Sequence, residues 1–320
     1  MIVKNGESSL DHKTVNRRLI KENVSYRTFL SRNSENRGKI LIFICASLIM
    51  AATMSITLFL TLQGIRSFTV DGLNPIKFLT GIHWNPESHQ HASYGALPFI
   101  FGSFTVTILA ALIAAPIGIG SALFMTEIAK TWGQKMLQPV IEILVGIPSV
   151  VYGLIGLSVI VPFIRSQFGG LGFGMLAAAI VVGIMILPTV ASLAADAIKS
   201  VPDEWRQASY ALGATKWQTI YKVVIPAALP SLLTAVVLGM ARAFGEALAV
   251  QMVIGNAKVL PHSLIEPAAT LTTMITLSMG HTTDGSVLND ALWSLGLILL
   301  IMTYIFIILI RFLSKRGRLS

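Results

Sequence analysis

Six long stretches with almost no charged residues constrain this chain more than any other feature of its sequence. They are Ile40–Leu62, Ala96–Met125, Met136–Ile164, Leu171–Ala195, Ala227–Gly255 and Ala291–Ile310. A helix that crosses the hydrocarbon core of a bilayer needs about 20 predominantly apolar residues, and each stretch reaches that length. The stretches lack the alternation of barrel strands, and in lipid each segment must satisfy its own backbone polar groups. We therefore predict an all-α integral membrane protein with six transmembrane helices.

The composition excludes an ordinary soluble domain. Hydrophobic residues make up 54% of the chain and charged residues only 12%, against about 25% charged residues in soluble proteins. The first apolar stretch starts at Ile40 and is too long for a cleaved signal peptide, so we expect it to remain as a helix. It holds the one cysteine, Cys45, which we expect to be buried and to pack as a small hydrophobic side chain.

The distribution of basic residues predicts the orientation in the membrane. If the N-terminus is cytoplasmic and the six helices alternate, 19 of the 24 Lys and Arg lie on the cytoplasmic side and four outside, with Arg242 inside the fifth helix. Such a bias is the positive-inside signature of an inner-membrane protein with both termini in the cytoplasm. The net charge of +9 is therefore read as a topology signal with contact to lipid, rather than as nucleic-acid binding.

The polar segments outside the apolar stretches carry weaker predictions. Residues 1–38 are basic and rich in Asn and Ser, which favours a disordered cytoplasmic tail; a short interfacial helix around Thr14–Leu30 is the alternative. In the first outside loop, His89 and His91 lack further ligands, so a solvated loop is favoured over a metal site. In the second outside segment, Ala268–Gly280 is too short to span and is expected to form a helix at the outer surface.

The cytoplasmic segment between the fourth and fifth stretches has the pattern of two helices. Pro202-Asp203-Glu204 is a typical helix start, and Gly213 interrupts the helical spacing that follows. Thr215 is placed to cap a second helix, Lys216–Val224. We expect this helix–glycine–helix element to dock a partner protein.

The same segment resembles the coupling loop of ABC importer permeases, whose motif is E-A-A-x3-G-x9-I-x-L-P. Here the run is Gln207-Ala208-Ser209, then Gly213, then Val223-Val224-Ile225-Pro226, with matching spacing. The Glu is replaced by Gln and the second Ala by Ser. The resemblance implies that Gln207, Ala208, Ser209, Gly213, Ile225 and Pro226 belong to the loop that fits a cleft on the ATPase subunit.

Further runs resemble the phosphate branch of this family, of the PstC type. They are Gly146-Ile147-Pro148-Ser149-Val150-Val151-Tyr152-Gly153-Leu154, Arg242-Ala243-Phe244-Gly245-Glu246-Ala247 with Gly255-Asn256, and the outside Trp84-Asn85-Pro86. The resemblance covers residues 40–312 and implies a five-helix permease core plus one N-terminal helix. The implied organisation is a tail (1–38), a first helix with its outside loop (39–95), a core (96–312) with the coupling loop 196–226, and a basic C-terminus (313–320).

The resemblance also implies the partners and cofactors. These are a second permease subunit of the PstA type, two cytoplasmic ATPase subunits of the PstB type and an extracytoplasmic phosphate-binding protein of the PstS type. This chain has no G-x4-G-K-[ST] motif, and its only Gly-Lys pair is Gly38-Lys39. We therefore expect no cofactor and no catalytic or metal site in the chain itself, with ATP and Mg²⁺ bound by the ATPase.

Two charged residues inside the fifth stretch are the candidate substrate pathway. Arg242 lies near the membrane midplane, where a charge costs at least about 2.5–3.5 kcal/mol on insertion scales. Glu246 is one helical turn further, so the two are expected to share a face and to pair. A guanidinium suits phosphate through bidentate hydrogen bonds, although an ion pair that only locks two helices is the alternative. Ser149 and Thr189 are expected to hydrogen-bond within their own helices.

Other functions stay open at this point. A permease for another oxyanion, such as sulfate or molybdate, shares the same features. A polytopic membrane enzyme with Glu246 as an acid, or a passive anion channel, would not need the patterned cytoplasmic segment.

Overall fold

The computed structural model describes residues 8–86, 92–129 and 131–316, with side chains for 38–86, 92–129 and 131–308. The predicted His89 and His91 lie outside the described residues. Within the described part, six helical spans are long and apolar enough to cross a membrane, as predicted. They are Gly38–Thr69, Leu97–Ile128, Ser149–Phe168, Met175–Lys199, Lys216–Phe244 and Val287–Ile308. The chain divides into two units, Met1–Phe59 and Leu60–Ser320, and each is described by itself.

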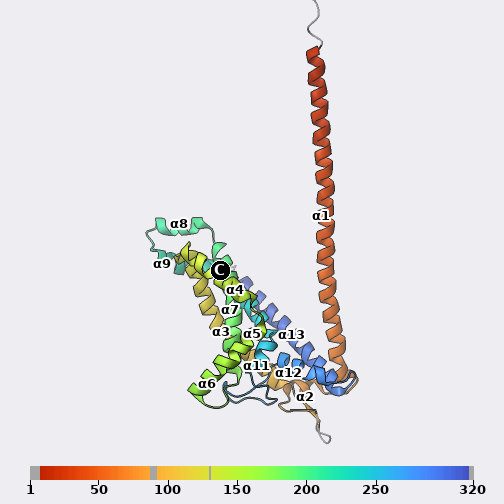
Figure 1. The fold of residues 1–320 in the computed structure, drawn as a ribbon, viewed down its shortest axis with the longest axis vertical. Helices are drawn as coiled ribbons and strands as arrows, with labels where there is room; N and C mark the ends of the chain where they lie inside the picture. The colour runs from red at the N-terminus through yellow and green to blue at the C-terminus, as the bar shows by residue number, and fades with distance from the viewer. Residues whose placement is uncertain (1–7, 87–91, 130, 317–320) are drawn as a thin grey trace, which may run out of the picture. The chain divides into compact units, whose positions relative to one another are not determined.

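Helix α1 (Ser8–Thr69) corrects two expectations about the N-terminal part of the chain (Figure 1). The predicted disordered tail is helical from Ser8 onward, and Thr14–Leu30 lies inside this helix instead of forming a short one. No proline interrupts the sequence between Ser8 and Thr69, so one helix can continue through the whole stretch. Cys45 is exposed and not buried, because the apolar part of α1 is hydrophobic on all sides and suits contact with lipid.

The second unit is built around α7 (Met175–Lys199). This helix is the most buried of the spans and packs along α3 (Leu97–Leu123), which continues into a π-helical turn, Phe124–Ile128. Small residues let the backbones approach closely: Gly118 of α3 and Gly239 of α10 (Ile225–Phe244) both face Val190 of α7. Helix α13 (Val287–Arg316) packs against α10.

Two of the predicted stretches are broken in the structure. The third is not one helix: α4 (Trp132–Gly146) ends before Pro148, and α5 (Ser149–Ile155) starts a new one. A π-helical turn, Gly156–Ile160, and α6 (Val161–Phe168) complete that span. Pro148 has no N–H and disfavours helical backbone in the residue before it, which explains the break. The fifth stretch is divided between α10 and α11 (Leu248–Val253).

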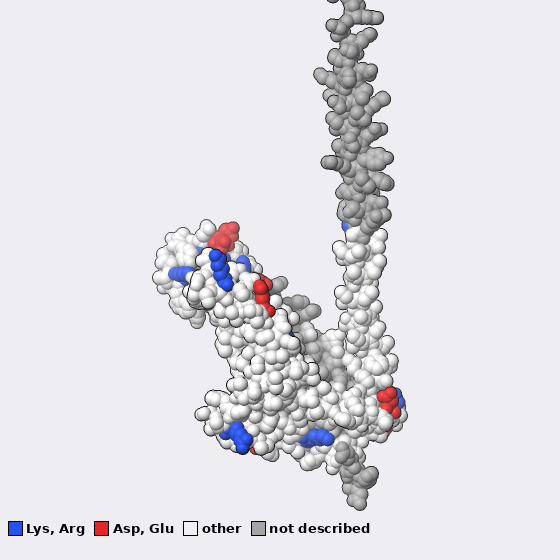
Figure 2. Space-filling view, viewed as in Figure 1, with Lys and Arg blue, Asp and Glu red and all other residues white. Residues whose placement is uncertain are grey.

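The two ends of the second unit differ in their elements (Figure 1). One end, which we call the α8 end, carries α8 (Asp203–Ala211), α9 (Lys216–Thr219) and the π-helical turn Ile220–Val224. The opposite end, which we call the α12 end, carries these elements: α2 (Pro75–Thr80), β1 (Trp84–Asn85), β2 (Ser93–Tyr94), α12 (Leu271–Ser278) and the 3₁₀ turn Met279–His281. On the face drawn in Figure 2, charged side chains gather toward these two ends, as expected for a unit whose middle faces lipid.

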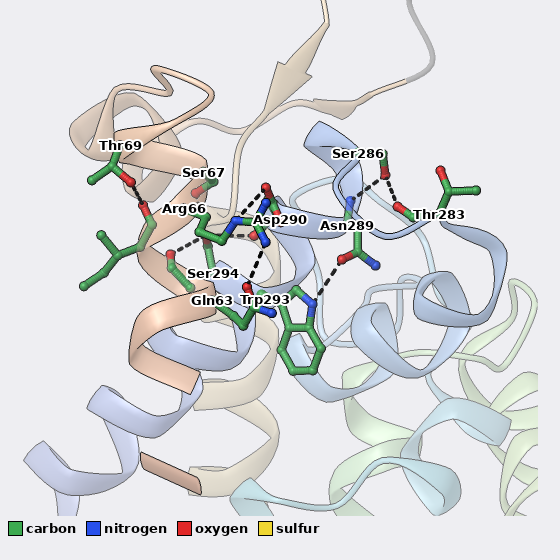
Figure 3. Close-up of polar contacts among 12 residues, drawn as sticks. Gln63, Arg66, Ser67, Thr69, Thr283, Ser286, Asn289, Asp290, Trp293 and Ser294 are labelled. Carbon is green, nitrogen blue, oxygen red and sulfur yellow. Dashed lines mark hydrogen bonds and ion pairs between the residues drawn. The ribbon is translucent and has the colours of Figure 1, made fainter. Parts of the chain in front are cut away.

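Polar contacts fasten the last turns of α1 to α13 at the α12 end (Figure 3). The Ser67 and Ser294 hydroxyls are 2.5 Å apart, and both are buried. The Ser294 hydroxyl also donates to the Gly64 carbonyl, 2.7 Å away. Arg66 Nε lies 3.7 Å from Asp290 Oδ2, so a buried carboxylate has a cation beside it. A helix predicted within Ala268–Gly280 is present as α12, which starts with a capping box from Thr270 and whose first turn is buried in the unit.

Candidate functional site

The break between α10 and α11 is the central feature of the candidate site. Helix α10 ends at Phe244 and α11 begins at Leu248, so Gly245, Glu246 and Ala247 lie outside regular helix. The backbone groups freed by the break have partners within the protein. The Ala249 N–H donates to Glu246 Oε1 over 3.1 Å, and the Thr272 hydroxyl donates to the Glu246 carbonyl over 2.8 Å. The break follows the end of the Lys216–Phe244 span, and irregular backbone at membrane depth is tolerated where such partners exist.

The break corrects the expected ion pair between Arg242 and Glu246. The i,i+4 relationship assumed one continuous helix, but the helix ends two residues before Glu246. The Glu246 carboxylate turns to the start of α11 instead, where it accepts from Ala249. Among the described residues, no ion pair joins Arg242 to any carboxylate.

Arg242 lies in the last turn of α10 with an exposed side chain, and α7 holds it. Its Nη1 donates to the Thr189 hydroxyl over 3.1 Å. Thr189 follows Pro188 within α7, and the helix-internal hydrogen bond expected for its hydroxyl is replaced by this contact. The helix-internal hydrogen bond expected for the Ser149 hydroxyl is also absent: within the described part of the chain, this hydroxyl forms no hydrogen bond in α5.

Tyr152 brings a third helix to the same region. It is buried on α5, and its hydroxyl donates to the Leu144 carbonyl of α4 over 2.8 Å. Helix α5 packs against α11, which follows the break next to Arg242. Sequence reasoning quoted Tyr152 only as part of a motif and set Thr189 aside, although both lie close to prolines that break or bend helices. The candidate site thus lies where α5, α7, α10 and α11 meet, and Arg242 is its cation.

The residues of the proposed coupling loop form a helix–turn–helix element, and the predicted shape of this segment is confirmed. Gln207 and Ala208 are exposed on α8, and the Ser209 hydroxyl lies 2.9 Å from that of Thr219. Gly213 adopts a φ of 79°, a left-handed conformation that favours glycine. Thr215 forms a capping box at the start of α9.

The second half of the motif and the surface around it complete this element. Ile225 and Pro226 open α10, where proline is compatible with the first turn. Large apolar side chains on the element face outward, with Leu212 89%, Trp217 65% and Trp205 53% exposed. Large exposed apolar side chains of this kind make the element a candidate contact surface for a partner.

A buried ion pair beside this surface was missed by sequence reasoning. Arg206, next to Gln207, is 8% exposed and lies 2.8 Å from Glu127 Oε1, whose side chain is 3% exposed. A hollow of about 360 Å³ opens next to the pair, lined by Glu127, Asp203, Arg206, Gln207, Tyr210 and Lys216. The two residues are 79 positions apart, so no local spacing rule could connect them.

Comparison with known proteins decides the family. Residues 114–318 match the family of binding-protein-dependent transport system inner membrane components. The chain belongs to the ABC importer permeases. A protein of Bacillus subtilis (strain 168), named probable ABC transporter permease protein YqgH, is 61% identical to this permease over 301 residues, which are 92% of this chain and 97% of the relative.

More distant relatives carry a substrate in their names. The phosphate transport system permease protein PstC of Xylella fastidiosa (strain 9a5c) is 32% identical over 298 residues, 87% of this permease and 90% of the relative. The protein of the same name from Haemophilus influenzae is 34% identical over 259 residues, 75% of this permease and 81% of the relative. The recognised resemblance to the PstC branch is therefore confirmed.

Solved structures confirm the fold. A chain of a bacterial ABC transporter involved in alginate import matches with a TM-score of 0.60 at 15% identity, over 90% of this permease and 98% of that chain. A chain of the inward-facing MetNI methionine ABC transporter matches with a TM-score of 0.53 at 22% identity, over 70% and 94%. At these identities the likeness concerns the arrangement of helices alone.

Proposed function

We propose that this permease forms, together with a second permease subunit, the path by which inorganic phosphate enters a bacterial cell. The observation that carries the proposal is the Arg242 guanidinium, which has a hydroxyl partner on α7 and no carboxylate partner among the described residues. A cation that no neighbouring charge neutralises attracts an anion strongly in a medium of low dielectric. A pathway for an oxyanion needs such a group.

The depth of Arg242 supports this role. Pro226 lies in the first turn of α10, and Arg242 follows 16 residues later on the same helix. At about 1.5 Å per residue the separation is about 24 Å, within a hydrocarbon core about 30 Å thick. The guanidinium therefore lies within the span but close to the end opposite the α8 end, and not at the midplane that the sequence suggested; a functional gain would compensate for the cost of a charge at this depth.

The chemistry of the two charged residues suits passage rather than storage. A guanidinium offers paired donors that match two phosphate oxygens. The Glu246 carboxylate, close along the chain but bound to Ala249, adds a negative charge that weakens anion binding. Phosphate is favoured as the substrate because the named PstC relatives transport it, whereas the more similar YqgH has no substrate in its name. Sulfate and molybdate are the alternatives.

The α8 end is the proposed contact with the ATPase. The charge bias of the sequence supports a cytoplasmic position for this end and for both termini. Its exposed Trp205, Leu212 and Trp217 offer apolar contacts, and the ATPase would supply ATP and Mg²⁺. An extracytoplasmic phosphate-binding protein would deliver the substrate at the α12 end.

The decisive experiment measures ATP hydrolysis by the assembled complex. The permease is purified with its co-expressed second permease and ATPase subunits and reconstituted into nanodiscs. Binding protein loaded with phosphate or with sulfate is then added. Stimulation by the phosphate-loaded form alone is the expected result. Stimulation by the sulfate-loaded form alone would identify sulfate instead of phosphate as the substrate. Failure of any ATPase to associate would overturn the proposal and favour a channel or an enzyme.

A further inference from the structure

The Arg206–Glu127 pair is unusual because both side chains are buried and each nitrogen of the guanidinium donates a hydrogen bond. Arg206 Nε and Nη2 donate to Glu127 Oε1 over 3.1 and 2.8 Å. Nη2 also donates to the Ile198 carbonyl over 3.0 Å, and Nη1 to Asp203 Oδ1 over 3.1 Å and to the Val201 carbonyl. A buried guanidinium persists only where its donors and its charge are compensated in this way.

These contacts join three separate parts of the second unit. Ile198 belongs to the last turn of α7, where carbonyls have no partner within the helix. Asp203 is the first residue of α8, with a side chain 78% exposed. Glu127 belongs to the π-helical turn Phe124–Ile128 that follows α3. Arg206 thus fixes the first coupling helix to the ends of two transmembrane helices.

The π-helical turn matters for the position of Glu127. In this turn the Ala129 N–H donates to the Phe124 carbonyl five residues earlier, over 2.8 Å, instead of four residues earlier. The wider turn changes the direction in which the last side chains of the helix point, and such turns are frequent at functional sites. A second link from the loop reaches the same turn, because Lys216 Nζ of α9 donates to the Ile128 carbonyl over 3.3 Å.

The path from this pair leads to the candidate site. Helices α3 and α7 pack closely along each other through small residues, so they respond to a push as one body. Thr189 of α7 holds Arg242. A continuous series of packed and hydrogen-bonded groups therefore connects α8 with the candidate site.

We propose that the Arg206–Glu127 ion pair is a transmission latch, which passes ATPase-driven movement of α8 to α3 and α7. Arg206 and Glu127 are positioning residues in this scheme and do not touch the substrate. The inference rests on the proposed role of the α8 end as the ATPase contact. It does not depend on which anion is transported.

The test follows a conformational change that needs no substrate. A Cys45→Ser/Gly245→Cys chain carries one reporter thiol in the break between α10 and α11. A Cβ at Gly245 would approach only the Arg242 carbonyl, at an ordinary 3.8 Å, and its backbone is not left-handed. The full complex in nanodiscs is trapped with Mg-ATP and vanadate, and the rate of maleimide labelling is compared with the nucleotide-free state.

We expect trapping to change the labelling rate of the reference chain by at least about fivefold, and that of its Glu127→Gln version by less than about twofold, with the ATPase still bound. Arg206→Lys keeps the positive charge but loses the forked geometry, and it should behave like Glu127→Gln. It also serves if Glu127→Gln does not fold. Glu142→Gln removes an exposed carboxylate from α4 and should keep the full response.

The outcomes separate the two proposals. A full response from a folded Glu127→Gln or Arg206→Lys complex would overturn the latch and leave the proposed function in place. A reference chain that binds no ATPase or shows no response to trapping would overturn the coupling role of the α8 end, and the latch with it.

Discussion

Arg242 and Thr189, 53 positions apart in sequence, meet through a single hydrogen bond of 3.1 Å between α10 and α7. The bond orients a cation without neutralising it, since a hydroxyl carries no formal charge. Thr189 therefore positions the guanidinium, while the positive charge of Arg242 stays available to an anion. Both contributions can be tested by substitution.

Arg242→Gln should abolish phosphate uptake while the complex still assembles. Removal of one electrostatic donor at a critical position typically costs about 10²-fold in rate, and the exposed side chain contributes little packing. Uptake of radioactive phosphate into proteoliposomes measures the effect. Arg165→Gln, at an exposed position in the last turn of α6, is the matched control and should transport normally. Normal uptake by Arg242→Gln would refute the pathway role.

Thr189→Val should reduce uptake by about 3- to 10-fold. The substitution keeps the shape of the side chain but removes the acceptor, a loss of about 0.5–1.5 kcal/mol in orienting Arg242. Thr189→Ser retains a hydroxyl and should transport like the parent. In the Arg242→Gln background the Thr189→Val change should have no further effect. Additive losses in the double variant would contradict a shared role.

Gly102→Ala should destabilise the permease although the substitution is small. An added Cβ would collide with the Ala269 carbonyl just before α12, and overpacking of this kind typically costs about 1–3 kcal/mol. Gly120→Ala on the same helix meets no atom within 4 Å and should be neutral or stabilising by about 0.5–1 kcal/mol. Thermal unfolding in detergent compares the two. Equal melting temperatures of the two variants would mean that the backbone at the α12 end moves to accommodate the added methyl group at little cost.

Gly213→Ala should weaken ATPase association by straining the turn between α8 and α9. The φ of 79° costs an L-residue roughly 1–2 kcal/mol, and an added Cβ meets no neighbour that would add a clash. Gly213→Asn tolerates the left-handed conformation better and should retain more binding. Co-purification of the ATPase subunits with each variant gives the comparison. Stronger ATPase binding by Gly213→Ala than by Gly213→Asn would show that strain in this turn does not determine ATPase association.

Asp71→Asn should raise stability at neutral pH and leave it unchanged in acid. Burial raises the pKa of the Asp71 carboxyl, nearby Asp290 raises it further, and Arg66, which Figure 3 shows beside Asp290, lowers it. A raised pKa means that the folded state holds the proton more tightly than the unfolded state. The stabilising contribution is complete below the unfolded pKa of about 3.9 and is lost as the pH rises through the folded pKa.

Thermal melting curves recorded from about pH 3.5 to about pH 8 test this pattern, because this range covers the titration of an aspartate. The Asp71→Asn midpoint should exceed that of the parent at the upper end and meet it at the lower end. Asp284→Asn, at an exposed position, is the control and should follow the parent. A gain in melting temperature from Asp71→Asn that increases as the pH falls would show that the folded state lowers, and does not raise, the pKa of Asp71.

Local patterns in the sequence were enough to predict much of this permease. Hydrophobic length predicted six spans, and the spacing around Gly213 and Thr215 predicted the helix–turn–helix. The contacts of Arg206 and Arg242 were beyond such reasoning, because each joins helices far apart in the chain. The i,i+4 rule failed at Glu246 because it assumes an unbroken helix, whereas Thr272 and Ala249 stabilise the break from outside α10.

The carboxylate of Glu246 has one more consequence, because it occupies the Ala249 amide at the start of α11. A substrate anion in the candidate site therefore cannot use the Ala249 N–H, because the Glu246 carboxylate already accepts from it. The exposed side chain of Arg242 remains available to the anion, and a side chain can change its orientation whereas the backbone donor is fixed. A site that offers Arg242 without the Ala249 amide would therefore hold an oxyanion less tightly than one that offered both donors. That property distinguishes a conduit from a receptor.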